Sequence, residues 1–263
     1  MTVEGLGHRL LGERGDVVLL LNGGMMTYEA WDPVSSPLGD RFRILGCDLR
    51  GQLRSPGGGH DDLSGHVADV VGLLNTLDLG VVHVLGTSFG GEVGLLLAAR
   101  HPERVQSLAA VTAVDRTPPG LAEDSRHLAQ LVTRVLEGGE PGLFHDALVR
   151  DVYSEAYRTA HAAELADRRR RALPDAWYRG LLGILANVED FDLTPDLGAI
   201  VCPALVVHAA ADAVMPAERV CALASALGCA ELAVHPTSGH ALVAEDPGWL
   251  ADVYLDFLGR RCG

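Results

Sequence analysis

The chain has 263 residues and a mass of 27.8 kDa, which is enough for one large domain or two modest ones. Hydrophobic residues make up 48% and charged residues 21%, which excludes a disordered chain. The formal net charge of −14 makes nucleic acid and anionic membrane surfaces poor partners. No apolar run approaches the ~20 residues of a membrane-spanning helix, and the first residues lack an export signal, so the expected location is cytoplasmic.

Short apolar runs alternate with longer segments of helical periodicity along most of the chain. The runs predicted to be strands are 17–21, 43–47, 81–85, 108–111, 204–208 and 230–235. The segments predicted to be helices are 66–78, 90–101, 217–227 and 247–258. Continuous apolar runs are typical of strands that are covered on both faces. The sequence therefore predicts an α/β fold, with a mostly parallel central sheet and helices on both faces.

The alternation is interrupted once, between Asp115 and about Pro195, where the chain becomes rich in Arg, Ala, Leu and Glu. Ligand sites of open α/β sheets lie outside the carboxyl ends of the strands, so a helical insertion leaving that edge would cover the site. Ordinary crossover helices are the alternative, but about eighty residues exceed the usual crossover. We predict a core of residues 1–114 and 196–263 and a helical cap, or lid, of residues 115–195.

An odd number of cysteines, without the spacing of a zinc site, occurs at Cys47, Cys202, Cys221, Cys229 and Cys262. Cys47 and Cys202 lie in or beside apolar runs that are predicted to be strands. Buried free thiols in a reducing compartment fit this pattern better than disulfides or a metal site. We therefore expect no metal ion.

The residues Gly86-Thr87-Ser88-Phe89-Gly90 form a G-x-S-x-G pattern between a predicted strand and a predicted helix. The bare pattern also arises by chance, but this setting is the one required for a strained turn that exposes a serine hydroxyl. The two glycines allow strand and helix to approach closely, and the helix N-terminus favours a developing oxyanion. We predict that Ser88 is a nucleophile; a glycine-rich turn capped by a hydroxyl is the structural alternative.

A serine nucleophile needs a base, and the base needs an orienting acid, in the chain order Ser, Asp or Glu, His. Asp212 fits as the acid because its loop follows the predicted strand 204–208; a turn residue or helix N-cap is the alternative. His240 fits as the base because it follows the last predicted strand and precedes the closing helix. Among the eleven histidines, His235 is the nearest rival, but it lies before the turn.

Backbone amides are expected to stabilise the oxyanion, one from Phe89 and one from the loop after strand 17–21. That loop contains Gly23 and Gly24, which permit a backbone turned inward toward a ligand. We assign Gly24 as the second donor. Met25 is the alternative, because the register within a pair of glycines is open.

Apolar side chains near the predicted nucleophile indicate a small, largely apolar substrate. Met25, Met26 and Phe89 would form soft apolar walls, and Trp177 of the insertion is a further candidate for the pocket. Nucleophilic chemistry of this kind requires no metal ion and no organic cofactor. We expect a monomer or homodimer whose partner is a small-molecule substrate.

Four motifs, in order, resemble those of α/β-hydrolase-fold proteins over nearly the whole chain. Residues 86–90 match the nucleophile elbow, and residues 48–55 resemble the D-x-R-G-x-G-x-S segment after the fourth strand of the family. Residues 209–216 resemble the G-x-x-D-x-x-x-P acid loop, with Ala for Gly. Residues 239–247 match the G-H…E-x-P ending. The resemblance implies an α/β-hydrolase fold, in which the short start of this chain leaves one of the eight usual strands missing or vestigial.

Two positions depart from the family pattern. Asn22 stands where many members have a histidine at the oxyanion turn, which resembles the enol-lactonase branch. Residues 52–53 are Gln-Leu, where a His-Gly or similar pair is usual. Both departures spare the three residues of the predicted triad, and both leave the reaction class open.

The leading interpretation is a serine hydrolase that cleaves an ester or lactone through an acyl-enzyme. The first alternative is a non-hydrolytic enzyme of secondary metabolism on the same scaffold, performing an acetate elimination, a lactone rearrangement or a cofactor-free perhydrolase reaction. The second alternative is a ligand-binding pseudoenzyme. The intact set of Ser88, Asp212 and His240 argues against the latter.

Overall fold

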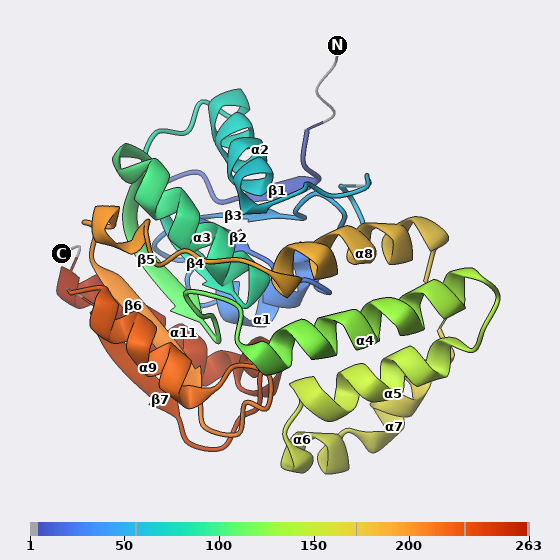
Figure 1. The fold of residues 1–263 in the computed structure, drawn as a ribbon. Coiled ribbons are helices and arrows are strands. Elements are labelled where there is room, and N and C mark those ends of the chain that lie inside the picture. Colours follow the sequence, from blue (N-terminus) through green and yellow to red (C-terminus); the bar gives the residue numbers. More distant parts are fainter. Residues whose placement is uncertain (1–4, 56, 172, 229, 262–263) are drawn as a thin grey trace.

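A seven-stranded, mostly parallel sheet forms the centre of the molecule (Figure 1). The computed structural model describes residues 5–55, 57–171, 173–228 and 230–261. The strand order is β1-β3-β2-β4-β5-β6-β7, and only β1 runs antiparallel to its neighbour. The strands are β1 (His8–Leu11), β2 (Val17–Leu21), β3 (Arg43–Cys47), β4 (Val82–Thr87), β5 (Val105–Val111), β6 (Ala204–Ala209) and β7 (Ala230–His235).

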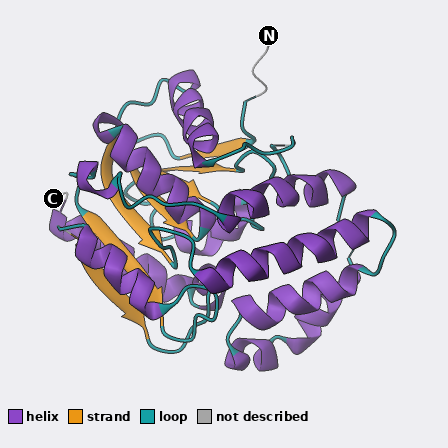
Figure 2. Cartoon of the chain, in the orientation of Figure 1, coloured by secondary structure: helices purple, strands orange, loops and turns teal. Residues whose placement is uncertain are grey.

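Helices cover both faces of this sheet, as Figure 2 shows. The α-helices of the described residues are α1 (Asp32–Ser35), α2 (Leu63–Thr76), α3 (Phe89–Arg100), α4 (Pro119–Leu136), α5 (Pro141–Val152), α6 (Glu155–Ala160), α7 (Ala162–Arg170), α8 (Asp175–Glu189), α9 (Ala217–Ala226), α10 (Leu242–Glu245) and α11 (Pro247–Arg261). The predicted α/β fold class is confirmed. Helix α2 begins three residues before its predicted start because the Asp62 carboxylate caps it, accepting hydrogen bonds from the backbone N–H groups of Ser64 and Gly65.

The continuous apolar runs follow from the two-sided burial of the strands. In β2, Val17, Leu19 and Leu21 pack into the core beneath α2, α3 and α9. The alternate residues Val18 and Leu20 pack into the opposite core, beneath α1 and α11. Because side chains alternate between the two faces, both sets must be apolar. This is why the pattern of the inner strands is predictable from the sequence.

The edge strand β1 was not predicted. Its four residues, His8–Leu11, are exposed or half-buried, and they pair antiparallel with Cys47–Ile44 of β3. A short strand that packs on only one neighbour needs no apolar run, so it leaves no strong signal in the sequence. The expectation that the sheet has fewer strands than the eight usual in the family agrees with the seven strands of the described residues.

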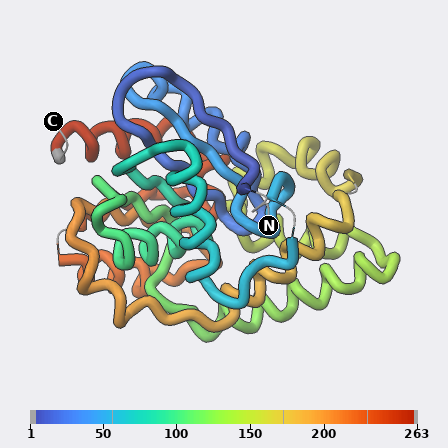
Figure 3. Tube along the Cα trace, turned by 90° about the horizontal axis from the view of Figure 1, so that it is seen from above, coloured from blue at the N-terminus to red at the C-terminus, as the bar shows by residue number. Residues whose placement is uncertain are grey.

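Helices α4–α8 follow β5 and precede β6 along the chain. In space they lie to one side of the sheet, as Figures 1 and 3 show. Helices α4, α5 and α8 share an apolar cluster, which includes Val132, Phe144 and Trp177. The chain leaves and re-enters the sheet at one place, because Arg116 forms a β-bridge with Asp192. We call residues 115–195 the cap, after this arrangement.

Three further expectations concern single residues and composition. Cys47 and Cys202 are buried and Cys221 is exposed, whereas Cys229 and Cys262 lie outside the described residues. In the described ranges, no three His, Cys, Asp or Glu side chains are grouped so that they could hold a metal ion. None of the helices described is both long and apolar enough to cross a bilayer.

The closest backbone approach near the centre of the sheet lies between β4, α3 and β2. A Cβ atom added to Gly86 would lie 2.3 Å from the carbonyl oxygen of Gly90, and one added to Gly90 would lie 2.3 Å from that of Leu21. Real Cβ atoms do not come so close to backbone. Glycine at these positions is therefore what lets α3 begin directly against the end of β4.

Replacing Gly90 with Ala should lower the free energy of unfolding by about 2 kcal/mol or more, because backbone, not a flexible side chain, must move. Urea denaturation measures this change. Gly120→Ala in α4 is the matched control, since a Cβ atom there meets nothing within 4 Å. Equal stability of the two variants would contradict the steric argument.

Candidate functional site

Ser88 stands at the sharp turn between β4 and α3, close to the middle of the sheet. Its backbone has φ 51° and ψ −126°, a conformation that is costly for any residue with a side chain. The turn is fixed by its N–H, which donates to the carbonyl oxygen of Val111 at 2.8 Å, and by its own carbonyl, which accepts from Gly91 at 2.7 Å. The Ser88 side chain is thus held outward beyond the carboxyl end of β4, where a strained serine is the expected signature of an exposed nucleophile.

The structure brings the three predicted residues Ser88, Asp212 and His240 together at this edge of the sheet. The Ser88 hydroxyl lies 3.0 Å from Nε2 of His240, and Nδ1 of His240 lies 3.0 Å from Oδ2 of Asp212. They follow β4, β6 and β7, so parallel strands deliver residues 152 positions apart in the chain to one place. The geometry is that of a serine, a base and an orienting carboxylate.

Asp212 is held rigidly for this contact. Its Oδ1 accepts the backbone N–H groups of Val214 and Met215 at 2.8 and 2.9 Å, which leaves Oδ2 for His240. The carboxylate side chain is fully buried. One oxygen of Asp212 therefore stabilises the turn, as the structural alternative expected, while the other one faces the imidazole.

The rival base His235 lies elsewhere. At the end of β7, its Nδ1 accepts the N–H of Ser238 at 2.9 Å, and its Nε2 donates to the Asp246 carboxylate at 3.2 Å. Its ring also packs edge-on against Trp249. These contacts occupy both ring nitrogens. They indicate a structural role for His235 at the end of β7.

Burial alone would disfavour a charged imidazole at His240. The charge of Asp212, its hydrogen bond and the nearby Glu92 outweigh this effect and raise the pKa of His240 above its usual value. A base with a raised pKa accepts a proton more readily. The surroundings of His240 therefore favour the protonated state that a proton transfer from Ser88 would create.

The amides predicted as oxyanion donors lie beside this serine. The backbone N–H groups of Phe89, Gly24 and Met25 make no hydrogen bond to any residue that the structure describes. All three residues border the same cavity as Ser88. Unpaired N–H groups at a helix N-terminus and a glycine turn are suited to a developing negative charge. Both Gly24 and Met25 remain available as the second donor.

A buried polar network supports the turn at Gly23 and Gly24. The Asn22 amide donates to Asp48 and to Gln52, at 3.0 Å each, and its oxygen accepts from the Trp31 indole at 3.0 Å. The Gln52 amide in turn donates to the Gly23 carbonyl at 2.8 Å. The two positions that depart from the family pattern, Asn22 and Gln52, are thus hydrogen-bonded partners. Through these hydrogen bonds they support the loop that contains Gly23 and Gly24, a role that the sequence did not reveal.

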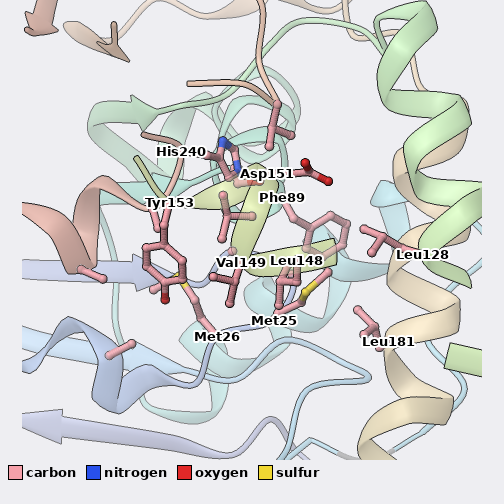
Figure 4. Close-up of a pocket in the computed structure, with 18 of the residues that line it drawn as sticks. Met25, Met26, Phe89, Leu128, Leu148, Val149, Asp151, Tyr153, Leu181 and His240 are labelled. Carbon is pink, nitrogen blue, oxygen red and sulfur yellow. Dashed lines mark hydrogen bonds between the residues drawn. The ribbon is translucent and has the colours of Figure 1, made fainter. Parts of the chain in front are cut away.

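A cavity of about 780 Å³ lies between the core and the cap, and Ser88 is one of the residues that line it. Figure 4 shows it with Phe89 and His240 among its walls. Met25, Met26 and Trp177, the predicted pocket residues, all line it. Most of the other walls are apolar side chains from α4, α5 and α8, such as Leu128, Leu148, Val149 and Leu181. The cavity therefore fits a largely apolar molecule with one reactive polar group near Ser88.

Sequence reasoning missed Glu92, which lies one helical turn beyond Ser88 in α3. It is fully buried, and neither carboxyl oxygen has a hydrogen-bond partner of normal geometry among the described residues. Burial raises the pKa of Glu92 to about 8, and the opposing effects of His240 and of a backbone contact at Val114 are smaller. The available signal was a single acid inside the otherwise apolar run of α3.

Known proteins resemble this chain over nearly its whole length. The model of the alpha/beta hydrolase fold family matches residues 16–247. A relative from Caulobacter sp. (strain K31), named "Putative carbamate hydrolase RutD", is 30% identical over 98% of this chain and 97% of its own. A thermophilic esterase from Thermogutta terrifontis has a TM-score of 0.82 at 26% identity, covering 97% of this chain and 93% of its own.

An enol-lactonase from Burkholderia xenovorans LB400 is similarly close, with a TM-score of 0.83 at 25% identity, covering 97% of this chain and 96% of its own. The chain belongs to the alpha/beta hydrolase fold family. The predicted resemblance is thereby confirmed, and the class of enzyme is a hydrolase.

The buried Glu92 should make stability depend on pH. Its pKa is about 8 in the folded chain against an ordinary value of 4.5, so the fold is destabilised as pH rises between these values. The Glu92→Gln variant removes this effect. Its advantage in free energy of unfolding over the wild-type chain should grow by on the order of 3 kcal/mol between about pH 5 and pH 8.

Urea denaturation at several pH values measures this difference. Glu123→Gln, at an exposed position of α4, is the matched control. A difference between Glu92→Gln and the wild-type chain that stays constant with pH would show that Glu92 does not titrate as its burial requires.

Proposed function

We propose that this chain hydrolyses an ester or lactone of a small, largely apolar substrate through a covalent acyl-enzyme. The observation that carries the proposal is the continuous series of hydrogen bonds from Ser88 through His240 to Asp212, of which Ser88 and His240 border a largely apolar cavity. Such a series activates a hydroxyl that is otherwise a weak nucleophile at neutral pH.

In the acylation step, His240 Nε2 takes the proton of Ser88 Oγ as this oxygen attacks the substrate carbonyl carbon. Asp212 holds the imidazole with its proton on Nδ1 and stabilises the imidazolium that forms. The protonated His240 then donates its Nε2 proton to the leaving alkoxide. In a lactone, the leaving oxygen remains attached to the acyl group.

The tetrahedral intermediate carries its charge on the former carbonyl oxygen. We assign its stabilisation to the N–H groups of Phe89 and Gly24, with Met25 as the alternative to Gly24. One such donor typically contributes ~2.7–4 kcal/mol of transition-state stabilisation. Water then attacks the acyl-enzyme with His240 again as the base, releasing the acid and restoring Ser88.

The cap, residues 115–195, is proposed to act as a lid that selects the substrate. Its helices α4, α5 and α8 contribute most of the apolar wall above Ser88. Its helices also have an apolar cluster of their own around Val132 and Phe144, although Leu121 and Ile184 pack into a core of the sheet. Both facts support a part whose side chains vary the substrate range while the core supplies the chemistry.

A carbamate is a second candidate substrate class, favoured by the name of the Caulobacter relative. Its carbonyl presents the same carbon to Ser88, and its nitrogen or oxygen leaves with the proton from His240. A panel of p-nitrophenyl esters of increasing chain length, assayed beside the matching carbamates, distinguishes the two classes. We expect faster turnover of the esters, because the cavity walls are mainly apolar.

Ser88→Ala should abolish turnover while leaving the fold intact, because no other hydroxyl lies on His240 Nε2 in the described site. Turnover of the best ester of the panel is compared between the variant and the wild-type chain, and circular dichroism checks the fold of the variant. The wild-type reaction is also run in H₂¹⁸O. Hydrolysis must place solvent oxygen in the acid product. A product without the label would favour an elimination or rearrangement, and full activity of the variant would end the assignment of the nucleophile.

His240→Ala should lower kcat/KM by ~10³-fold or more, because the base is lost. In the wild-type chain, kcat/KM should fall as pH decreases through the raised pKa of His240, since the protonated imidazole cannot accept a proton. The acid limb is therefore expected above the ordinary value of 6.5. His235→Ala is the control; a larger loss there than at His240 would reassign the base.

A further inference from the structure

The cap touches the core at the loop that carries His240. Helix α5 of the cap ends at Val152, whose carbonyl oxygen accepts the backbone N–H of Ala241 at 2.8 Å. Ala241 is the residue directly after His240. Tyr153, the next residue of the cap, borders the cavity together with His240 (Figure 4). The end of α5 and the loop after β7 are therefore joined beside the reactive centre.

A carboxylate strengthens this junction from the core side. Both oxygens of Glu245, at the end of α10, are bound by Ser154 of the cap. The Ser154 N–H donates to Oε1 at 2.8 Å, and its hydroxyl donates to Oε2 at 2.6 Å. Ser154 is almost completely buried. Hydrogen bonds to a charged group in such surroundings are stronger than those between neutral groups.

The packing on the other side of His240 is equally tight. A Cβ atom added to Gly239 would lie 2.6 Å from the Ser154 backbone nitrogen and 2.9 Å from Oε1 of Glu245. The backbone both before and after His240 is thus in contact with residues 152–154 of the cap. On the core side, the His240 carbonyl accepts from the Thr112 hydroxyl at the longer distance of 3.3 Å.

We propose that Glu245 and Ser154 are positioning residues that keep His240 in line with Ser88 only while the cap lies on the core. The inference rests on the proposed function, because it concerns the base of that reaction. When residues 152–154 of the cap move away, the backbone at Gly239 and Ala241 loses its contacts with the cap and keeps only those within the core, such as the hydrogen bonds that the Ala241 carbonyl accepts from Ala244 and Glu245. The catalytic base is then released together with the cap.

The consequence is a coupling of chemistry to closure. The 3.0 Å contact between Ser88 and His240 is made from a loop whose neighbours are held by the cap. A misplacement of a catalytic group by about 1 Å can cost about a hundredfold in rate. An open cap therefore leaves Ser88 poorly activated, which suppresses its reaction with molecules too small to be enclosed.

The experiment measures the rate at which a small fluorophosphonate probe labels Ser88. Glu245→Ala should lower this rate by about tenfold or more, although the cap is looser and access is easier. Glu245→Gln should retain the rate within about threefold, because its amide can still accept from the Ser154 N–H and donate to the Ser154 hydroxyl. Ser154→Ala, which keeps the N–H contact, should lie between the two.

Thr133→Ala is the matched control in the cap, since its exposed hydroxyl bonds only to its own helix at Ala129. Its labelling rate should equal that of the wild-type chain. Thermal unfolding of each variant shows whether it is folded. If Glu245→Ala does not fold, the order of the rates for Ser154→Ala and Glu245→Gln carries the test.

Hydrogen–deuterium exchange provides a measurement that does not depend on activity. In Glu245→Ala, the amides of both Ser154 and Ala241 should exchange faster, since the proposal joins cap and loop. Labelling of Glu245→Ala as fast as the wild-type chain, or unchanged exchange at Ala241, would overturn the proposal. Absence of labelling in the wild-type chain itself would instead contradict the proposed function, and exchange at Ala241 would then decide the coupling alone.

Discussion

The close approach of β4 and α3 at Gly86 and Gly90 is the constraint on which the rest of the structure depends. Two positions without side chains let the helix begin against the end of the strand, so Ser88 must take a strained conformation. This strain is maintained because the sheet is buried on both faces and cannot relax around it. The same geometry leaves the Phe89 N–H without a partner in the described residues, at a residue that borders the cavity.

The parallel topology brings further loops to the same edge of the sheet as the turn at Ser88. The loops after β2, β6 and β7 leave the sheet at the same edge as the elbow after β4, and each is fixed by its own hydrogen bonds. Asn22 and Gln52 fix the first loop, and the N–H groups after Asp212 fix the second. The third is held both by the core, where the Ser238 carbonyl accepts from the Ala211 N–H, and by the cap, at Val152. The proposed chemistry therefore relies on hydrogen-bonded loops at one edge of the sheet.

Electrostatics distinguishes the two buried acids near His240. Asp212 accepts two backbone N–H groups and faces the imidazole, so its charge is balanced. For Glu92, the charge of His240 and a backbone contact at Val114 do not offset burial, which raises its pKa to about 8. In the proposed reaction, Asp212 orients the base, whereas Glu92 is expected to reduce stability at neutral pH. Destabilised groups of this kind are typical of functional sites.

The sequence by itself determined the inner strands, the elbow at Ser88 and the order of Asp212 and His240, because two-sided burial and glycine sterics act over a few neighbouring residues. It could not determine the half-exposed strand His8–Leu11, which needs no apolar run. Only the tertiary structure decided that Asn22 meets Gln52, that Glu92 lies near enough to His240 to affect its pKa, and that Glu245 binds the cap. Those contacts join residues from separate elements, and the sequence position of a polar side chain does not indicate which distant residue it will bind.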